Sequence, residues 1–192
     1  MVTLFLIPTR YRHLVGSLVY LAVTRPDISY PVHILSQFVS APTSVHYSHL
    51  LRVLRYLRGT IYHHLFFPRS SSLELQAYSD AIWAELRAMA MSTAEVIWLR
   101  WLLEDFGVSA TTSTPLLSDS TGAISIARDP VKHELTKHIG VDAHFVRAAV
   151  QDQTLALHYV PSELQLADFF TKAQTRAQHD FLLSKFSVVD PP

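Results

Sequence analysis

Cysteine is absent from this chain of 192 residues. Without thiols the chain can form no disulfide framework, no thiolate metal site and no cysteine nucleophile. Glycine is scarce, with five residues, and 49% of the chain is apolar, which indicates a globular rather than a disordered protein. Net charge is also absent, because sixteen basic residues balance sixteen acidic ones. This balance argues against a strongly basic nucleic-acid binder but leaves a local basic face open.

Long apolar runs are missing as well. No stretch approaches the ~18 residues that a membrane-spanning helix needs. The opening MVTLFLIPTR is apolar, but it has no basic leader and no clear small-residue cleavage site after it, so we do not interpret it as a signal peptide. We therefore expect a soluble protein with no membrane partner.

The first part of the chain, residues 1–67, has the pattern of a small helical segment. Apolar residues at helical spacing and the breaks at Pro26 and Gly59 predict helices over 11–23, from Pro31 to 38, and over 44–58. A strand is predicted over 61–67. The following residues, PRSSS, have the composition of a linker, and we place the domain boundary there.

A basic stripe lies on the third predicted helix. Arg52, Arg55 and Arg58 recur every three residues beside the apolar positions. Such a stripe can bind phosphates. More often it is the pattern of an ordinary solvated helix face. Both interpretations stay open.

Beyond the linker, residues 73–190 predict an α/β domain. We expect, in order, a strand over 73–79, a helix over 83–106, a strand over 115–118, a helix over 120–127, an apolar-patterned segment over 135–151, a strand over 154–160, and helices over 162–172 and 175–186. Alternation of strands and helices favours parallel pairing. Trp98 and Trp101 lie at helical spacing with Ile97, and we predict that they pack in the core rather than stack on bases.

Four acidic residues lie close to predicted strand ends: Asp80, Glu85, Asp119 and Asp168. Ligands of open α/β sheets gather at the carboxyl ends of the strands, so these side chains could converge although they are scattered in the sequence. Four carboxylates without cysteine suit Mg²⁺ rather than zinc. Each residue also has an ordinary interpretation, as a helix cap, as an acid at a positive helix end, or as a solvated or partnered helical acid.

Histidine is frequent, with eleven residues, but its pattern does not indicate zinc. The pairs His63 with His64 and His133 with His138 have no cysteine partners and no HExxH spacing. We predict no zinc site.

Several blocks, which together cover nearly the whole chain, carry a resemblance to a known family. They are, in order, YRHLVGSLVYLAVTRPDISYPVHILSQFVSAPTSVHYSHLLRVLRYLRGT, AYSDAIWA, ELRAMA, AEVIWLRWLLEDFGV, LLSDSTGAISIARDPV, TKHIGVDAHFVR and HYVPSELQLADFFTK. Together they resemble the C-terminal part of the Pol polyprotein of copia-type LTR retrotransposons.

This resemblance implies a fold and a function. Residues 1–67 are similar to the helical thumb or connection region of a reverse transcriptase, and residues 73–190 to a ribonuclease H domain. Such domains hydrolyse RNA in RNA/DNA hybrids with two Mg²⁺ ions, and the ligand roles fall by resemblance on Asp80, Glu85, Asp119 and Asp168. An RNA/DNA hybrid, the rest of a Pol polyprotein, and a cytoplasmic or nuclear location are the expectations that follow. Asp142, in HIGVDAHF, is interpreted as structural.

Two departures from the family pattern qualify this expectation. The aspartate-rich polymerase motif is absent, so we expect no polymerase activity. In addition, AIWA runs directly into ELRAMA, whereas family members have two more strands between these blocks. Loss of this hairpin predicts a sheet of about three strands, an exposed edge at the strand before Asp80, and a displaced Glu85. A catalytically inactive retroelement remnant, or a nucleic-acid-binding scaffold, is therefore the alternative.

Overall fold

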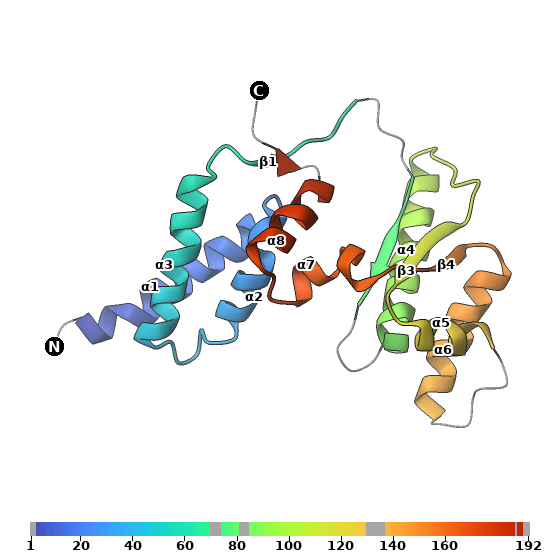
Figure 1. Ribbon diagram of the computed structural model, residues 1–192, viewed down its shortest axis with the longest axis horizontal. Coiled ribbons are helices and arrows are strands. Elements are labelled where there is room, and N and C mark those ends of the chain that lie inside the picture. Colours follow the sequence, from blue (N-terminus) through green and yellow to red (C-terminus); the bar gives the residue numbers. More distant parts are fainter. Residues whose placement is uncertain (1–2, 70–73, 81–84, 130–136, 187, 190–192) are drawn as a thin grey trace. The chain divides into compact units, whose positions relative to one another are not determined.

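A computed structural model describes residues 3–69, 74–80, 85–129, 137–186 and 188–189 of the chain (Figure 1). The chain divides into two compact units, one made of Met1–Arg69 with Lys172–Pro192 and the other of Ser70–Thr171. The division between Arg69 and Ser70 falls within the predicted linker, residues 68–72. Residues 172–190, which we assigned to the second domain, group with the helical unit. The assignment of 1–67 and 73–190 to two domains stays a prediction.

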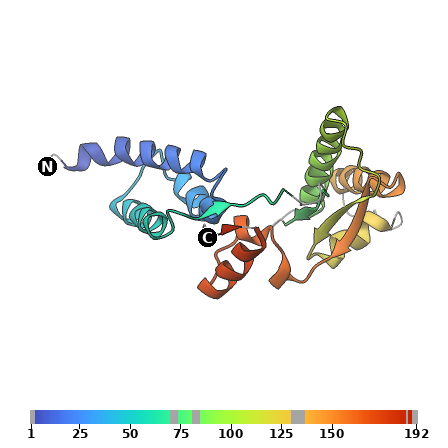
Figure 2. The same ribbon diagram turned by 90° about the horizontal axis from the view of Figure 1, so that it is seen from above.

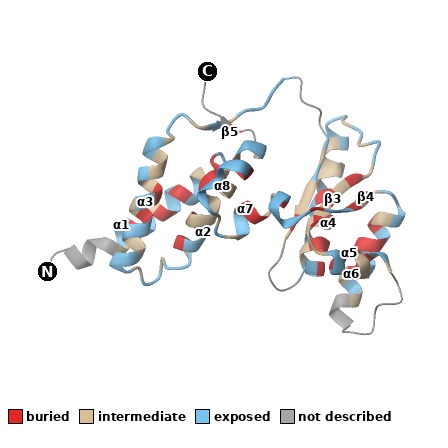
Figure 3. Cartoon of the chain, viewed as in Figure 1, coloured by how far each residue is buried: buried red, intermediate tan, exposed pale blue. Residues whose placement is uncertain are grey.

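The helical unit begins with three α-helices. They are α1 (Thr3–Leu21), α2 (Ser29–Ser36) and α3 (Ser44–Gly59), with a short 3-10 turn η1 (Pro26–Ile28) between the first two. Thr43 caps α3, since its side chain accepts a hydrogen bond from the backbone N–H of His46. The core of this unit is formed by buried apolar side chains from the helices and η1: Tyr11, Val15, Leu18, Ile28, Val32, Leu35, Leu50 and Val53. Figure 3 colours the buried residues red.

The C-terminal residues complete this unit. Helix α8 (Arg176–Leu183) is capped by Thr175 and is followed by the 3-10 turn η3 (Ser184–Phe186). Strand β5 (Val188–Val189) pairs antiparallel with β1 (His64–Leu65). The strand that we predicted over 61–67 is therefore only two residues long, and its partner is a segment more than 120 residues away in sequence.

The second unit is built on a parallel sheet of three strands among the described residues. They are β2 (Ala77–Ser79), β3 (Thr114–Ser118) and β4 (Leu155–Tyr159), in the order β2-β3-β4. Alternate residues of β3 are buried, as the period-2 pattern of a strand requires. The parallel pairing and the small sheet agree with the sequence prediction, and β2 is an edge strand.

Three longer helices pack with this sheet. They are α4 (Glu85–Asp105), α5 (Thr121–Arg128) and α6 (Lys137–Gln151), and α4 packs against α6 (Figure 2). One apolar core joins the helices to the strands, with Met89, Leu116 and Val146 fully buried in it. Gly107 follows α4 with φ 77°, a left-handed conformation that glycine adopts without strain and that ends the helix. Asp142 accepts a 3.0 Å hydrogen bond from Arg87, which links α6 to α4.

Two sequence predictions are wrong in this unit. Residues 162–172 do not form one helix: they form a 3-10 turn η2 (Ser162–Leu164) and a separate short helix α7 (Asp168–Thr171), because Gln165 between them is extended, with ψ 103°. The two tryptophans of α4 are not in the core. Trp98 is 53% exposed and Trp101 is 64% exposed, since the other side of α4 faces the sheet and α6.

Candidate metal centre

Three of the four predicted acidic residues converge at the carboxyl ends of the strands. Asp80 directly follows β2, Asp119 directly follows β3, and Asp168 is the first residue of α7. Because Ser79 and Ser118 are register partners, the two aspartates that follow them leave neighbouring strands side by side. One carboxylate oxygen from each of the three aspartates lies within 4.8 Å of the others. A divalent cation can bridge oxygens that lie this close.

Hydroxyl groups orient two of these carboxylates. Thr171 Oγ1 donates a 2.6 Å hydrogen bond to Asp80 Oδ2, and Ser162 Oγ donates a 2.9 Å hydrogen bond to Asp119 Oδ2. In both cases the hydroxyl group binds the Oδ2 atom of the carboxylate. Such outer partners fix the direction in which a ligand points.

Gln165 ties the segment before Asp168 to the strand before Asp80. Its side chain is fully buried, its Nε2 donates a 3.1 Å hydrogen bond to the Ser79 carbonyl, and its Oε1 accepts one of 3.2 Å from the Ala167 N–H. Ser79 and Ala167 each immediately precede a site aspartate. Sequence reasoning missed this residue, because a glutamine inside a predicted helix carries no local signal of such a role.

Glu85 is not part of the group of three. It is the first residue of α4, it is exposed, and its carboxylate accepts a hydrogen bond from the hydroxyl of Ser120. Ser120 is the N-cap of α5 and follows Asp119, so Glu85 reaches the neighbourhood of the site without joining its three aspartates. Only residues 81–84 separate Asp80 from α4, which accords with the displacement expected from the lost hairpin.

The donor set fits a hard cation. Like charges about 4.8 Å apart repel each other by roughly 1 kcal/mol in water and by about 3.5 kcal/mol at an effective dielectric constant of 20. Three carboxylates therefore gain from a divalent cation between them, and oxygen donors suit Mg²⁺ or Mn²⁺ rather than zinc. Within the described part of the chain, no histidine joins a group of three or more metal-ligating side chains. His133 and the side chain of His138 lie outside the described residues.

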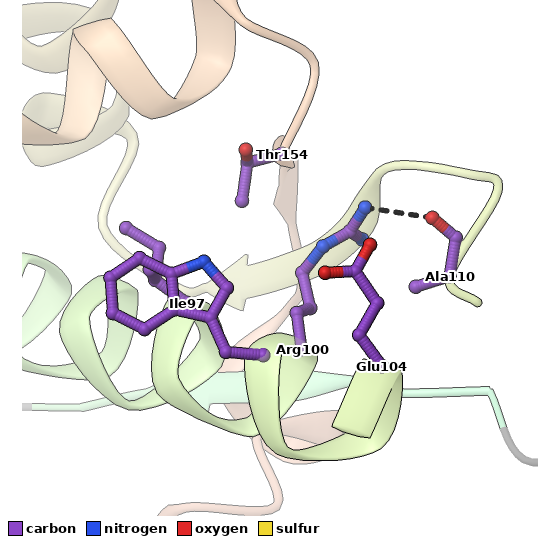
Figure 4. Close-up of a pocket in the computed structure, with 6 residues that line it drawn as sticks. Ile97, Arg100, Glu104, Ala110 and Thr154 are labelled. Atoms are coloured by element: carbon purple, nitrogen blue, oxygen red, sulfur yellow. Dashed lines mark hydrogen bonds between the residues drawn. The ribbon is translucent and has the colours of Figure 1, made fainter. Parts of the chain in front are cut away.

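A separate hollow lies at the other end of the sheet. It is lined by Ile97, Arg100, Trp101, Glu104, Ala110 and Thr154, and Figure 4 shows the Arg100 guanidinium donating to the Ala110 carbonyl. Thr154 precedes β4, whereas the three aspartates follow strands or begin α7. This hollow is therefore not part of the aspartate site.

The basic stripe of α3 belongs to the helical unit. Arg52, Arg55 and Arg58 are all exposed, while Leu50 and Val53 of the same helix are buried in the core. Their exposure fits both a solvated face and a phosphate-binding face.

Across the described residues, no helix has the length and apolar character of a membrane span.

Comparison with known proteins identifies relatives. The chain is 37% identical over 223 residues to the retrovirus-related Pol polyprotein from transposon RE1 of Arabidopsis thaliana, and 35% identical over 223 residues to that from transposon RE2 of the same plant. Both alignments cover 96% of the chain. The Pol polyprotein from transposon TNT 1-94 of Nicotiana tabacum is 30% identical over 205 residues, which covers 86% of the chain.

The chain spans only 15% of the length of each of these polyproteins. The alignments with RE1 and RE2 extend over more residues than the 192 of the chain, so these relatives contain segments that the chain lacks. No family model matches the chain. No solved structure matches it. The chain matches one segment of these retrotransposon polyproteins over nearly all of its own length, and it belongs to the family of retrotransposon Pol polyproteins.

Proposed function

We propose that the second unit is a ribonuclease H-like domain that hydrolyses the RNA strand of an RNA/DNA hybrid in the presence of Mg²⁺. The observation that carries this proposal is the convergence of Asp80, Asp119 and Asp168 to within 4.8 Å at the carboxyl ends of β2, β3 and the segment after β4. Membership of the Pol family supports the choice of substrate.

In this proposal the three aspartates hold the metal, and the surrounding residues keep their carboxylates aligned. Mg²⁺ would supply Lewis-acid activation of water and stabilisation of charge on the phosphate and the leaving oxygen. Thr171 and Ser162 fix two of the carboxylates through their hydroxyl groups, and Gln165 fixes the backbone in front of two of them. A well-aligned ligand set matters because a displacement of ~1 Å can lower a rate ~100-fold.

Glu85 has a different role in this proposal from the one that the family resemblance implies. Its carboxylate accepts a hydrogen bond from Ser120, so it supports the start of α5 beside Asp119. The same observation favours the second candidate function, a catalytically inactive remnant, because only three of the four family ligands converge. For that candidate, binding of nucleic acid would depend on Arg52, Arg55 and Arg58.

Cleavage of a labelled RNA/DNA hybrid by the purified chain tests the proposal. We expect Mg²⁺-dependent cutting that falls at least ~100-fold in Asp119→Asn, which removes a ligand charge with little change of shape. Glu85→Gln is the matched control: it neutralises an acid outside the group and is expected to keep most of the activity.

Metal binding provides a readout that does not depend on turnover. Titration with Mn²⁺, followed by its paramagnetic resonance signal, is expected to show a site that Asp119→Asn weakens and Glu85→Gln does not. A folded chain that neither binds Mn²⁺ at this site nor cuts the hybrid would reject the nuclease proposal and leave the inactive remnant.

A further inference from the structure

Charge is divided unequally between the two units, although the whole chain is neutral. Met1–Arg69 with Lys172–Pro192 contains ten Lys or Arg residues and three Asp or Glu residues, a net charge of +7. Ser70–Thr171 contains six Lys or Arg residues and thirteen Asp or Glu residues, a net charge of −7. A molecule with two oppositely charged halves and no net charge has little self-repulsion and a strong tendency to associate head to tail.

The outer face of α4 is apolar and bordered by acids. Met91, Trp98 and Trp101 are 63%, 53% and 64% exposed, and they lie on the side of the helix opposite the buried Met89 and Val96. Three exposed acidic residues of the same helix border them: Glu95, Glu104 and Asp105. Two largely exposed tryptophans on one helix form an unusual surface for a monomer, since large apolar patches mark interaction sites.

The outer face of α3 has the complementary chemistry. Arg52, Arg55 and Arg58 are exposed along it, and Val45 is 60% exposed near its start. The three guanidinium groups are spread over six residues of helix, about 9 Å. Trp98 to Asp105 spans a similar length, about 10 Å. Guanidinium groups bind carboxylates and stack on indole faces, so each element of one surface has a partner on the other.

We propose that the outer face of α4 is the docking site for the outer face of α3 from a second copy of this chain. Each copy carries one of each surface, so α3 of one copy can dock on α4 of another. The exposed acids of this face, Glu95, Glu104 and Asp105, repel phosphates locally and attract a basic helix. This interface is independent of the aspartate site and of the nuclease proposal.

Sedimentation velocity of the full chain tests this interface. At about 50 mM salt we expect a dimer in the micromolar range, and at about 500 mM salt a dissociation constant at least 10-fold higher, because the contacts are exposed ion pairs. The α3-reversed chain (R52E/R55E/R58E) and the α4-reversed chain (E95K/E104K/D105K) should each be monomeric. A mixture of the two should form a heterodimer, since it restores one native α3 on α4 contact.

A matched control separates this docking from general attraction between the oppositely charged units. The chain R10E/R69E/R176E carries the same change of charge in the helical unit at three other exposed positions. We expect it to dimerise within about 3-fold of the native chain. Circular dichroism of every variant checks that it is folded.

Three outcomes would overturn the proposal. The first is a native chain that stays monomeric at 100 μM and low salt. The second is a dimer whose affinity is the same in the α3-reversed chain, which would place the interface elsewhere, such as the open edge of β2. The third is a monomer whose Arg52, Arg55 and Arg58 bind an RNA/DNA hybrid, which would assign the basic face to nucleic acid.

Discussion

Replacement of Asp27 by alanine is expected to destabilise the helical unit without disturbing the sheet unit. The Asp27 side chain is completely buried and accepts three hydrogen bonds: two from the Arg25 guanidinium, at 2.9 and 2.6 Å, and one from the Tyr56 hydroxyl, at 2.9 Å. Arg25 also donates to the carbonyl and hydroxyl oxygens of Thr60, at 2.9 and 2.8 Å. This network joins the turn before α2 to the end of α3.

The size of this destabilisation follows from the buried charge of Arg25, which the substitution leaves in place. Burial lowers the pKa of Arg25, but the hydrogen bond and negative charge of Asp27 outweigh this effect and raise it, so Arg25 is charged in a site where its side chain is 8% exposed. Removal of Asp27 leaves that charge buried without a carboxylate partner, with Thr60 and Tyr56 beside it. Breaking a buried pair in this way costs about 3–5 kcal/mol. A cost of this size is a large part of the stability of a small domain.

The distribution of tryptophan makes the assay selective. All three tryptophans of the chain lie within Ser70–Thr171, so their fluorescence reports only on the sheet unit. Urea unfolding followed by circular dichroism reports on the helices of both units. In Asp27→Ala we expect the part of the dichroism transition that belongs to the helical unit to move to lower urea, while the fluorescence transition stays within about 0.5 kcal/mol of the native one.

The double replacement Arg25→Leu with Asp27→Leu provides the comparison. It removes both charges, and apolar substitution of a buried pair is much less costly than loss of one partner. We expect it to be at least about 1.5 kcal/mol more stable than Asp27→Ala. An Asp27→Ala chain that loses less than about 1 kcal/mol, or a double variant no more stable than the single one, would refute the idea that the pair is a coupled buried network.

Two further predictions concern Tyr56 and Gln165. Burial raises the pKa of Tyr56, and the charge and hydrogen bond of Asp27 raise it further. A raised pKa stabilises the fold fully below the ordinary tyrosine pKa of about 10 and loses this contribution as the pH rises above it. Stability should therefore fall less steeply between about pH 9.5 and 11 in Tyr56→Phe than in the native chain, as measured by dichroism. A residual slope is expected from Tyr11, because burial raises the pKa of this side chain too. A slope that is the same in both chains would contradict this assignment. Gln165→Ala removes the buried donor to the Ser79 carbonyl. We expect it to lower the fluorescence-detected stability by about 1–3 kcal/mol and to weaken Mn²⁺ binding about 10–100-fold. Full metal affinity in a destabilised variant would show that Gln165 is structural only.

Local patterns were sufficient to predict most of the elements. The helices α1 to α3, the strand β3 and the helix α5 follow from apolar periodicity and from capping or breaking residues such as Thr43 and Gly107, which act over a few residues. The closeness of Asp80 and Asp119 also followed from the sequence, because two parallel strands end at the same edge of a sheet.

Other features depended on contacts between distant residues. The segment 162–172 has helical composition, but the extended Gln165 inside it bonds to Ser79, 86 residues away, and this bond divides the helix. The exclusion of Glu85 from the site was only partly foreseeable, since the sequence gives its distance along the chain from Asp80 but not the bond to Ser120 that holds it.

The sequence by itself determined the family, most of the order of the elements, and the four acidic candidates, of which the structure brings three together. The tertiary structure alone decided which side of α4 is covered. Apolar residues lie all around this helix, so periodicity could not distinguish a face that packs on the sheet from one that carries Trp98 and Trp101 into solvent. The sheet and α6 can bury only one side of a helix, and the side that remains exposed is set by packing rather than by local sequence.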